Sequence, residues 1–422
     1  MDVISVIGLG KLGAPMVAVF ASKGFKVVGL DINQEFVNKL AQGIAPVNEP
    51  QLKDFLAKYK TNISTTLDYK EIVERTDVTF IIVPTPSDKH GVFSNDYVLA
   101  VIKELGAALK HKNTKHNVVV TSTVMPGSTD GIIKSTLEKA SGKKVGQDIG
   151  LCYNPEFIAL GTVIRDMLYP DMVLIGESDV ESGNQLERIY NKVHGDHQPS
   201  IQRMNFVNAE LTKISVNTFV TTKISYANMM SDMCDHLDGA DVDVVCGALG
   251  SDSRIGKKYL KGGLGYGGPC FPRDNIAFAK LADQIGADAT LAKATDHINK
   301  LQPKRVVKKV QKLQGKNVTV LGLSYKPETE VSEESQGVMI ANELVTLGYN
   351  VNVYDPEAMV TAKNSLVEKV KCSSSLEDSL QDSEIIVIAT PWKEFDSYFK
   401  ENNVSANVVD CWKIIKKQGG II

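Results

Sequence analysis

The sequence predicts an α/β protein with two doubly wound parallel sheets joined by a long central helix. Three observations lead to this prediction. Short apolar runs alternate with amphipathic stretches over residues 1–199, the same alternation returns over 301–422, and a helical segment with few breakers spans 205–239 between them. Alternating strands and helices are typical of a parallel sheet covered by helices on both faces.

The chain is predicted to begin with a strand, a glycine loop, a helix and a second strand, in "VISVIGLGKLGAPMVAVFASKGFKVVGLD". Gly8, Gly10 and Gly13 fit a pattern in which one glycine permits a tight turn, one lets backbone approach a pyrophosphate and one lets the helix pack closely. Asp31, at the end of the second strand, would accept hydrogen bonds from ribose hydroxyls and repel a 2′-phosphate. Glycine-rich turns also occur for packing alone, but this full context predicts a Rossmann-like domain that binds NAD.

The remaining strands fall into two sets, and the second set resembles the first. The first set continues at 77–86, 116–124 and 148–157. In the second set, 316–326 resembles the opening strand, 348–356 resembles the second strand and 383–391 resembles 77–86. The second set lacks the third glycine of the fingerprint and places Ser324, Tyr325 and Lys326 in the loop, which suits a phosphate better than a dinucleotide. We therefore expect three domains, at 1–199, 200–300 and 301–422.

The helical segment 205–239 carries Lys213 and Asn217, which project from one face because they are four residues apart. A lysine beside apolar neighbours is most often a solvated edge residue. The helix itself can be a structural spacer, or it can brace both halves and supply a dimer surface.

The stretch "LKGGLGYGGPCFPRD" places five glycines within 262–268 and then a single thiol, Cys270. The glycines allow backbone to approach a ligand, and Pro272 suits the first turn of the helix that follows. A thiol just before a helix N-terminus has its thiolate form favoured. Asp274 would lie in the first turn, where it can stabilise the helix dipole or take part in chemistry. With NAD, a nucleophilic cysteine can carry an aldehyde on to an acid.

The composition excludes several other classes of protein. Lys and Arg sum to 47 against 50 Asp and Glu, so the net charge of −3 gives no reason to expect nucleic acid or an acidic membrane as partner. We expect a cytoplasmic protein, since neither a signal peptide nor a run of about 18 apolar residues is present. The six cysteines are scattered and form no CxxC pair, which argues against a disulfide scaffold and against a metal site.

Seven motifs, in matching order across almost the whole chain, give a specific resemblance: "GLGKLGAP", "VPTP", "STVMPGST", "NPEF", "AELTKISVN", "GLGYGGPCFPRD" and "LGLSYKPET". Together they resemble the UDP-glucose/GDP-mannose 6-dehydrogenase family. The resemblance implies oxidation of the C6 alcohol of a nucleotide-sugar to a carboxylate with two NAD. It also implies an NAD domain, a central helix used for homodimerisation and a nucleotide-sugar domain.

"NPEF" and "GLGYGGPCF" look closer to the members that act on UDP-glucose, which makes UDP-glucose the leading substrate. The alternatives are UDP-galactose, a UDP-N-acetylhexosamine or GDP-mannose, a two-electron dehydrogenase of the β-hydroxyacid type, and a non-catalytic nucleotide-sugar binding protein. A uronic acid product would suit polysaccharide biosynthesis.

The resemblance also implies roles for particular residues. Cys270 would be the nucleophile, with Lys213 and Asn217 stabilising the oxyanion of the tetrahedral species. Asp274 would work with this lysine and a water held by Thr123, and Glu156 would be a general acid and base. The positions implied for the cofactor are Gly8, Gly10, Lys11, Leu12, Gly13, Asp31, Pro84, Thr85 and Thr123. Those implied for the substrate are Glu156, Phe157, Lys213, Asn217, Tyr259, Lys261, Gly267, Lys326 and, from the partner subunit, Arg254.

Three positions depart from the family pattern. Leu160 stands where many members have a second glutamate, so that carboxylate's share of base catalysis must be absent or supplied elsewhere. Glu333 replaces an arginine in the loop after Lys326, which puts a cofactor contact in doubt. Trp412 replaces an arginine near the end of the chain, leaving Lys413 as the nearest cation. A nucleotide or sugar contact is expected to have changed there.

Overall fold

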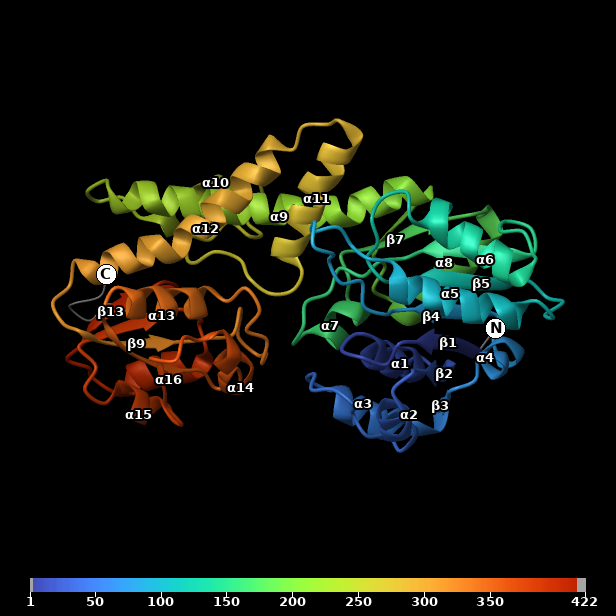
Figure 1. Cartoon of the computed structure of the whole chain (residues 1–422), viewed down its shortest axis with the longest axis horizontal. Helices are drawn as coiled ribbons and strands as arrows, with labels where there is room; N and C mark the ends of the chain where they lie inside the picture. The colour runs from blue at the N-terminus through green and yellow to red at the C-terminus, as the bar shows by residue number, and fades with distance from the viewer. Residues whose placement is uncertain (1–2, 416–422) are drawn as a thin grey trace. The chain divides into compact units, whose positions relative to one another are not determined.

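A computed structural model describes residues 3–415 of the protein. Its chain divides into two compact units, Met1–Ile214 (unit 1) and Ser215–Ile422 (unit 2). Each unit contains one sheet with helices on both faces (Figure 1). Within residues 3–415, no helix combines the length and the apolar character needed to cross a bilayer.

Unit 1 is built on an eight-stranded sheet with the order β3-β2-β1-β4-β5-β6-β7-β8. Neighbouring strands are parallel, with one exception: β6 and β7 are antiparallel. The strands are β1 (Val3–Ile7), β2 (Lys26–Leu30), β3 (Ile63–Thr66), β4 (Val78–Ile81), β5 (His116–Val120), β6 (Ile149–Tyr153), β7 (Met172–Glu177) and β8 (Ser200–Met204).

Two apolar cores cover the two faces of this sheet, and most strands contribute side chains to both. Ile4 and Val6 of β1 belong to one core, whereas Ile7 belongs to the other, as the alternation of a β-strand requires. The helices of unit 1 are α1 (Gly13–Ser22), α2 (Gln34–Ala41), α3 (Leu52–Tyr59), α4 (Tyr69–Arg75), α5 (Asp96–Leu109), α6 (Lys134–Ser141), α7 (Val163–Leu168) and α8 (Val180–His194).

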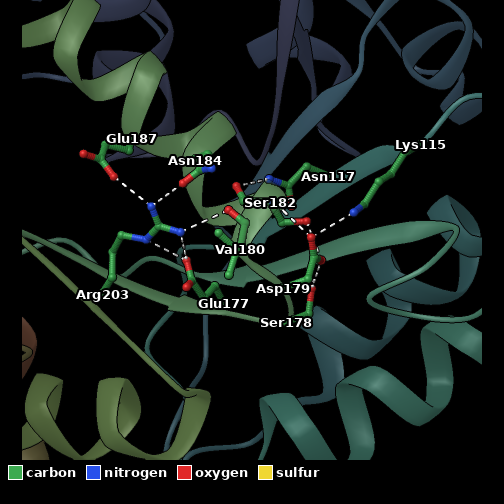
Figure 2. A network of polar contacts seen from close by, with 10 residues as sticks. All are labelled: Lys115, Asn117, Glu177, Ser178, Asp179, Val180, Ser182, Asn184, Glu187 and Arg203. Atoms are coloured by element: carbon green, nitrogen blue, oxygen red, sulfur yellow. Dashed lines mark hydrogen bonds and ion pairs between the residues drawn. The ribbon is translucent and has the colours of Figure 1, made fainter.

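A polar network ties α8 to the strands beside it (Figure 2). Asp179 caps the helix by accepting from the backbone of Ser182 at 3.0 Å, and it pairs with Lys115 at 2.8 Å. Although burial opposes ionisation, these hydrogen bonds hold the pKa of Asp179 at about 2. Arg203 of β8 pairs with Glu177 at 2.7 Å and Glu187 at 2.9 Å. The network holds α8 against β7 and β8, the last two strands in the order of the sheet.

Unit 2 contains a parallel five-stranded sheet with the order β11-β10-β9-β12-β13. Figure 1 shows α13 on one face and α15 and α16 on the other. The strands are β9 (Asn317–Leu321), β10 (Asn350–Tyr354), β11 (Lys371–Cys372), β12 (Ile385–Ile388) and β13 (Asn407–Asp410). The helices are α10 (Val242–Ser251), α11 (Phe271–Ile285), α12 (Thr290–Gln311), α13 (Gln336–Thr346), α14 (Met359–Ala362), α15 (Leu376–Leu380) and α16 (Lys393–Glu401).

Helix α9 (Phe206–Asp235) has 30 residues and runs from unit 1 into unit 2. It agrees with the predicted helix at 205–239 and ends shortly before Gly239. The predicted fold class, two doubly wound sheets with a long central helix, is confirmed. The antiparallel pair β6–β7 is a local departure from the all-parallel sheet that the alternation predicted.

The second sheet does have a third glycine, which the sequence pattern did not reveal. A Cβ added to Gly13 would overlap the carbonyl oxygen of Gly8, and a Cβ added to Gly337 would overlap that of Gly322 in the same way. Gly337 thus does in unit 2 what Gly13 does in unit 1. It escaped the fingerprint because a longer loop, 323–335, separates it from Gly322.

Candidate active site

In unit 1, four sequence motifs follow neighbouring strands at the carboxyl edge of the sheet. The glycine loop follows β1, "VPTP" follows β4, "STV" follows β5 and "NPEF" follows β6. Val83 and Ser122 join two of these loops, because the Ser122 hydroxyl donates to the Val83 carbonyl at 2.7 Å and accepts from its amide at 2.8 Å. Ligands of doubly wound proteins bind outside this edge. The structure therefore gathers Pro84, Thr85, Thr123 and Glu156 on one edge with the glycine loop.

The glycine turn has the geometry that a dinucleotide needs. Gly8 has φ +98°, which favours glycine. A Cβ on Gly10 would meet nothing within 4 Å, so the space above this residue is open to a ligand. Asp31 accepts from the amides of Leu9 at 2.6 Å and Asn33 at 2.8 Å, and a carboxylate has further lone pairs for ribose hydroxyls. These residues fit NAD.

Glu156 lies partly buried in the loop after β6, and burial raises its pKa to about 7. The Tyr190 hydroxyl of α8 lies 3.2 Å from Glu156 Oε1 and 2.5 Å from Asn154 Oδ1. The Asn154 amide is itself oriented by donating to the Leu174 carbonyl at 2.9 Å. A carboxyl group with a pKa near 7 can give up or take a proton at neutral pH.

Lys213 of α9 is buried, with 7% of its surface exposed. Its ammonium donates to the Glu156 carbonyl at 2.5 Å and lies 4.7 Å from the centre of the Phe157 ring. One turn earlier, buried Glu210 accepts from the amides of Gly127 at 2.6 Å and Thr129 at 2.7 Å. α9 is thereby tied to the loops after β5 and β6, and its lysine is not the solvated edge residue of the alternative interpretation.

In unit 2, Cys270 is exposed at the N-cap of α11, and Asp274 lies one turn into that helix. The Asp274 amide donates to the Cys270 carbonyl at 2.8 Å. Asp274 is 2% exposed, and Asn217 of α9 donates to its carboxylate at 2.6 Å. The structure thus joins Asn217, Asp274 and the Cys270 turn. Within residues 3–415, none of the six cysteines forms a disulfide.

Of the residues expected at the nucleotide-sugar, Gly267 lies in the loop before Cys270, and Lys326 lies in a segment that contacts this loop. Gly267 has no space for a side chain, because a Cβ there would overlap the Glu334 carbonyl oxygen. Lys326 is partly buried in the loop that contains Glu334, 5.8 Å from the Tyr325 ring centre. Tyr259 and Lys261 are exposed. Arg254, 87% exposed, pairs with Asp252 at 2.6 Å.

Two of the three departures from the family pattern, Leu160 and Trp412, have side chains that pack against the protein. Leu160 packs against the apolar core of unit 1. Glu333 contacts the loop before Cys270 through its backbone, since its carbonyl accepts from the Gly268 amide at 2.9 Å. Trp412 lies against Gly263, where an added Cβ would be 2.8 Å from the indole ring. Lys413 pairs with Asp241 at 2.8 Å.

A glycine turn open to a dinucleotide, a buried lysine and a cysteine at a helix N-terminus define the class of NAD-dependent dehydrogenases. The family models agree domain by domain. The NAD-binding domain of the UDP-glucose/GDP-mannose dehydrogenase family matches residues 2–194, its central domain 207–301 and its UDP-binding domain 319–417. The chain belongs to this family and is an NAD-dependent nucleotide-sugar 6-dehydrogenase.

Similar proteins cover nearly the whole chain. The UDP-glucose 6-dehydrogenase AglM of Haloferax volcanii is 33% identical over 99% of this chain and 98% of its own length. A GDP-mannose 6-dehydrogenase of Pseudomonas syringae pv. tomato is 32% identical over 96% of this chain and 95% of its own. The structure of a UDP-glucose dehydrogenase from Pyrobaculum islandicum superposes with a TM-score of 0.89 at 33% identity, covering 98% of this chain and 95% of that one.

Sequence reasoning missed the residues that hold the site from behind. Tyr190 contacts the catalytic candidate Glu156, and Glu210 holds the loop after β5. Glu49 accepts from the amides of Gly161 at 2.9 Å and Val163 at 2.8 Å, where the loop after Glu156 leads into α7. A polar residue in an apolar segment is the only signal that such residues leave in a sequence, and it does not name their partners.

Proposed function

We propose that this enzyme oxidises UDP-glucose to UDP-glucuronate, a four-electron reaction, through covalent intermediates on Cys270. The observation that carries the proposal is the Cys270 turn: an exposed thiol at the start of α11, with the carboxylate of Asp274 held by Asn217 one turn away. A two-electron oxidation of an alcohol requires no nucleophile, so this arrangement favours a reaction that continues to the acid.

When bound beside the glycine turn after β1, NAD would supply the hydride acceptor for each of the two oxidations. In the first, the C6 alcohol loses a hydride and a proton and becomes an aldehyde. The Cys270 sulfur then bonds to C6, and the carbonyl oxygen takes up a proton, which gives a thiohemiacetal. Loss of a second hydride and a proton leaves a thioester. Water finally adds to C6 and the C–S bond breaks, which releases the carboxylate and restores the thiol.

The charged groups suit these steps. The ammonium of Lys213 and the amide of Asn217 are one turn apart on α9 and would stabilise the oxygen of the tetrahedral species. Glu156, whose pKa burial raises to about 7, would accept the proton of the alcohol and later that of the attacking water. Asp274 and Thr123 would position that water.

UDP-glucose is the proposed substrate because two similar proteins, from Haloferax volcanii and Pyrobaculum islandicum, are named as UDP-glucose dehydrogenases. Lys326 would meet the diphosphate, and Tyr259, Lys261 and Gly267 would line the nucleotide-sugar. GDP-mannose is the alternative that the Pseudomonas relative supports. Trp412, which lies against Gly263 and stands where many family members have an arginine, would change a nucleotide or sugar contact.

The test is the ratio of NADH to sugar at completion, with limiting UDP-glucose, UDP-galactose, UDP-GlcNAc, UDP-ManNAc or GDP-mannose. We expect two NADH for each UDP-glucose. One NADH per sugar would reject the four-electron reaction, and two NADH from a different sugar alone would reject UDP-glucose. In Cys270→Ser, turnover to the acid should fall by orders of magnitude while NAD binding persists.

Lys326→Ala should raise the KM for UDP-glucose more than the KM for NAD, because a lost phosphate contact affects only the nucleotide-sugar. Equal changes in both constants would refute this placement of Lys326.

We also propose a homodimer that uses α9. Phe219, Tyr226 and Met233 recur every seven residues on this helix and are 66%, 45% and 52% exposed. Such an apolar stripe on a long helix suits packing against a second copy. Light scattering should give twice the chain mass of 46.0 kDa, and Phe219→Lys should shift it toward the monomer. A wild-type monomer with full activity would refute the proposal and the role of Arg254 across subunits.

A further inference from the structure

We propose that Asn228 and Asn299 are positioning residues that hold the nucleophile loop, residues 262–270, in its reactive conformation. The inference rests on the proposed function of Cys270. Both asparagines lie on long helices, Asn228 on α9 and Asn299 on α12, and each uses its whole side-chain amide on the backbone of this loop.

Asn299 pairs with Tyr266 as one β-strand residue pairs with another. Its Oδ1 accepts from the Tyr266 amide at 2.7 Å, and its Nδ2 donates to the Tyr266 carbonyl at 2.9 Å. Asn299 is 6% exposed, so water does not compete freely for these bonds. Gly265 leaves the room for this pair, because a Cβ there would overlap Asn299 Oδ1.

Asn228 forms the second clip, three residues earlier in the loop. Its Oδ1 accepts from the Gly263 amide at 2.9 Å, and its Nδ2 donates to the Leu264 carbonyl at 3.0 Å. Asn228 is fully buried. Arg305 of α12 donates to the Asn228 backbone carbonyl at 3.0 Å, which ties this turn of α9 to α12.

The loop needs such clips because it has no regular secondary structure and five glycines. Glycine loses more conformational entropy on ordering than any other residue, so an unclipped loop would sample many conformations. Tyr266 is four residues from Cys270, and its hydroxyl accepts from Asn275 of α11 at 2.7 Å. Fixing Tyr266 therefore fixes the backbone on the approach to the thiol.

Asparagine is required at both places because each amide donates and accepts at once. An ionised aspartate would keep the acceptor but turn a second oxygen toward a backbone carbonyl, whereas a protonated aspartate would restore the donor. Asn299→Asp and Asn228→Asp should therefore work at low pH and fail as the new carboxyl group ionises.

The charged groups around each asparagine should shift the pH at which its aspartate variant loses half of its activity, and the two shifts should differ. The charged groups beside Asn299 on α12 are Asp296, one turn earlier, and Lys300, which pairs with Asp296 at 2.7 Å. The other groups packed around Asn299 are Tyr266 and Gln336 of α13. At Asn228 the facing group is the guanidinium of Arg305, with Asp235 paired to it at 3.4 Å. Asn299→Asp should consequently lose function at a higher pH than Asn228→Asp.

The experiment measures kcat and both KM values of the two aspartate variants across pH, beside Asn208→Asp, an exposed control on α9. We expect kcat to fall about 100-fold at alkaline pH and to recover toward the wild-type value at acidic pH, with the KM for NAD unchanged. The control should follow the wild-type profile. Wild-type pH profiles in both clip variants would overturn the proposal.

Two readouts separate this proposal from the function of Cys270. Hydrogen exchange of residues 262–268 and the rate of Cys270 alkylation by iodoacetamide need no turnover. The ratio of each rate in the aspartate variants to that in the wild type should change with pH. Full turnover in Cys270→Ser would reject the proposed function. If hydrogen exchange of residues 262–268 still depends on Asn228 and Asn299, the positioning role of these two residues would nevertheless be supported. Gly265→Ala, which displaces Asn299 without altering it, should speed exchange of 262–268, and unchanged exchange in that variant would overturn the proposal.

Discussion

The two sheets begin with the same turn and use it for different purposes. In unit 1 the close pair Gly8 and Gly13 is separated by four residues, and the space above Gly10 is open. In unit 2 the close pair Gly322 and Gly337 encloses the loop 323–335, which reaches the nucleophile loop through Tyr325, Glu333 and Glu334.

The acidic residue after the second strand shows the same contrast. Asp31 accepts from the Leu9 amide and keeps acceptor capacity. Asp355 is 1% exposed, and it accepts from the Leu323 and Ser324 amides, the Ser324 hydroxyl and the Trp392 indole. A turn of this kind is a scaffold first, and it receives a dinucleotide only where the chain leaves it unfilled.

The largest effect expected from this comparison is on Gly337. Gly337→Ala should destabilise unit 2 by about 3 kcal/mol or more, because its Cβ has no space beside the Gly322 carbonyl. Gly13→Ala should do the same in unit 1. Urea unfolding followed by hydrogen exchange would assign the loss to a unit, and Gly247→Ala, with nothing within 4 Å, is the control. A Gly337→Ala variant as stable as the control would remove the equivalence of the two turns.

The second prediction separates the two aspartates. Asp355→Asn should cost about 2 kcal/mol of stability, because buried donors lose a charged acceptor. Asp31→Asn should cost less than about 1 kcal/mol but raise the KM for NAD and weaken discrimination against NADP. Thermal unfolding and steady-state kinetics check both, and equal stability losses would contradict the contrast between a filled and an open turn.

A third prediction concerns pH and belongs to unit 1 alone. The pKa of Glu156 is about 7 when folded and 4.5 in a model peptide, so the folded protein binds the extra proton between these values. Stability should therefore fall as pH rises through this window, and Glu156→Gln should be more stable than the wild type at pH 8 by about 2 kcal/mol. Urea midpoints across pH test this, and parallel profiles of variant and wild type would refute the raised pKa.

The smallest effect is expected at residues with a strained backbone, for which we choose one exposed example from each unit. Gln51 has φ +68° and Glu328 has φ +60°, and both side chains are exposed. Gln51→Gly and Glu328→Gly should each stabilise by about 0.5 kcal/mol, because relief of strain outweighs the added freedom of the unfolded chain. A lower melting temperature in either variant would show that the side chain makes a contact that compensates for the strain.

The sequence predicted the fold class, α9 and the NAD turn because each has a local pattern: alternation, a long segment without breakers, or a glycine spacing. It did not reveal Gly337, since a 14-residue separation matches no fingerprint. Asn228 and Asn299 were also missed, because their partners lie 35 and 33 residues away along the chain. The predicted strands ran past their true ends where loops such as "VPTP" start with residues that also suit strands.

Helix α9 carries Glu210, Lys213, Asn217 and Asn228 on one continuous rod, and each makes a specific contact. Each inserted residue turns a helix by about 100° and lengthens it by about 1.5 Å. One extra residue between Lys213 and Asn228 would leave one of the two aimed away from its partner. Surface loops of this enzyme can change length during evolution or engineering, whereas the spacing along α9 can change by substitution only.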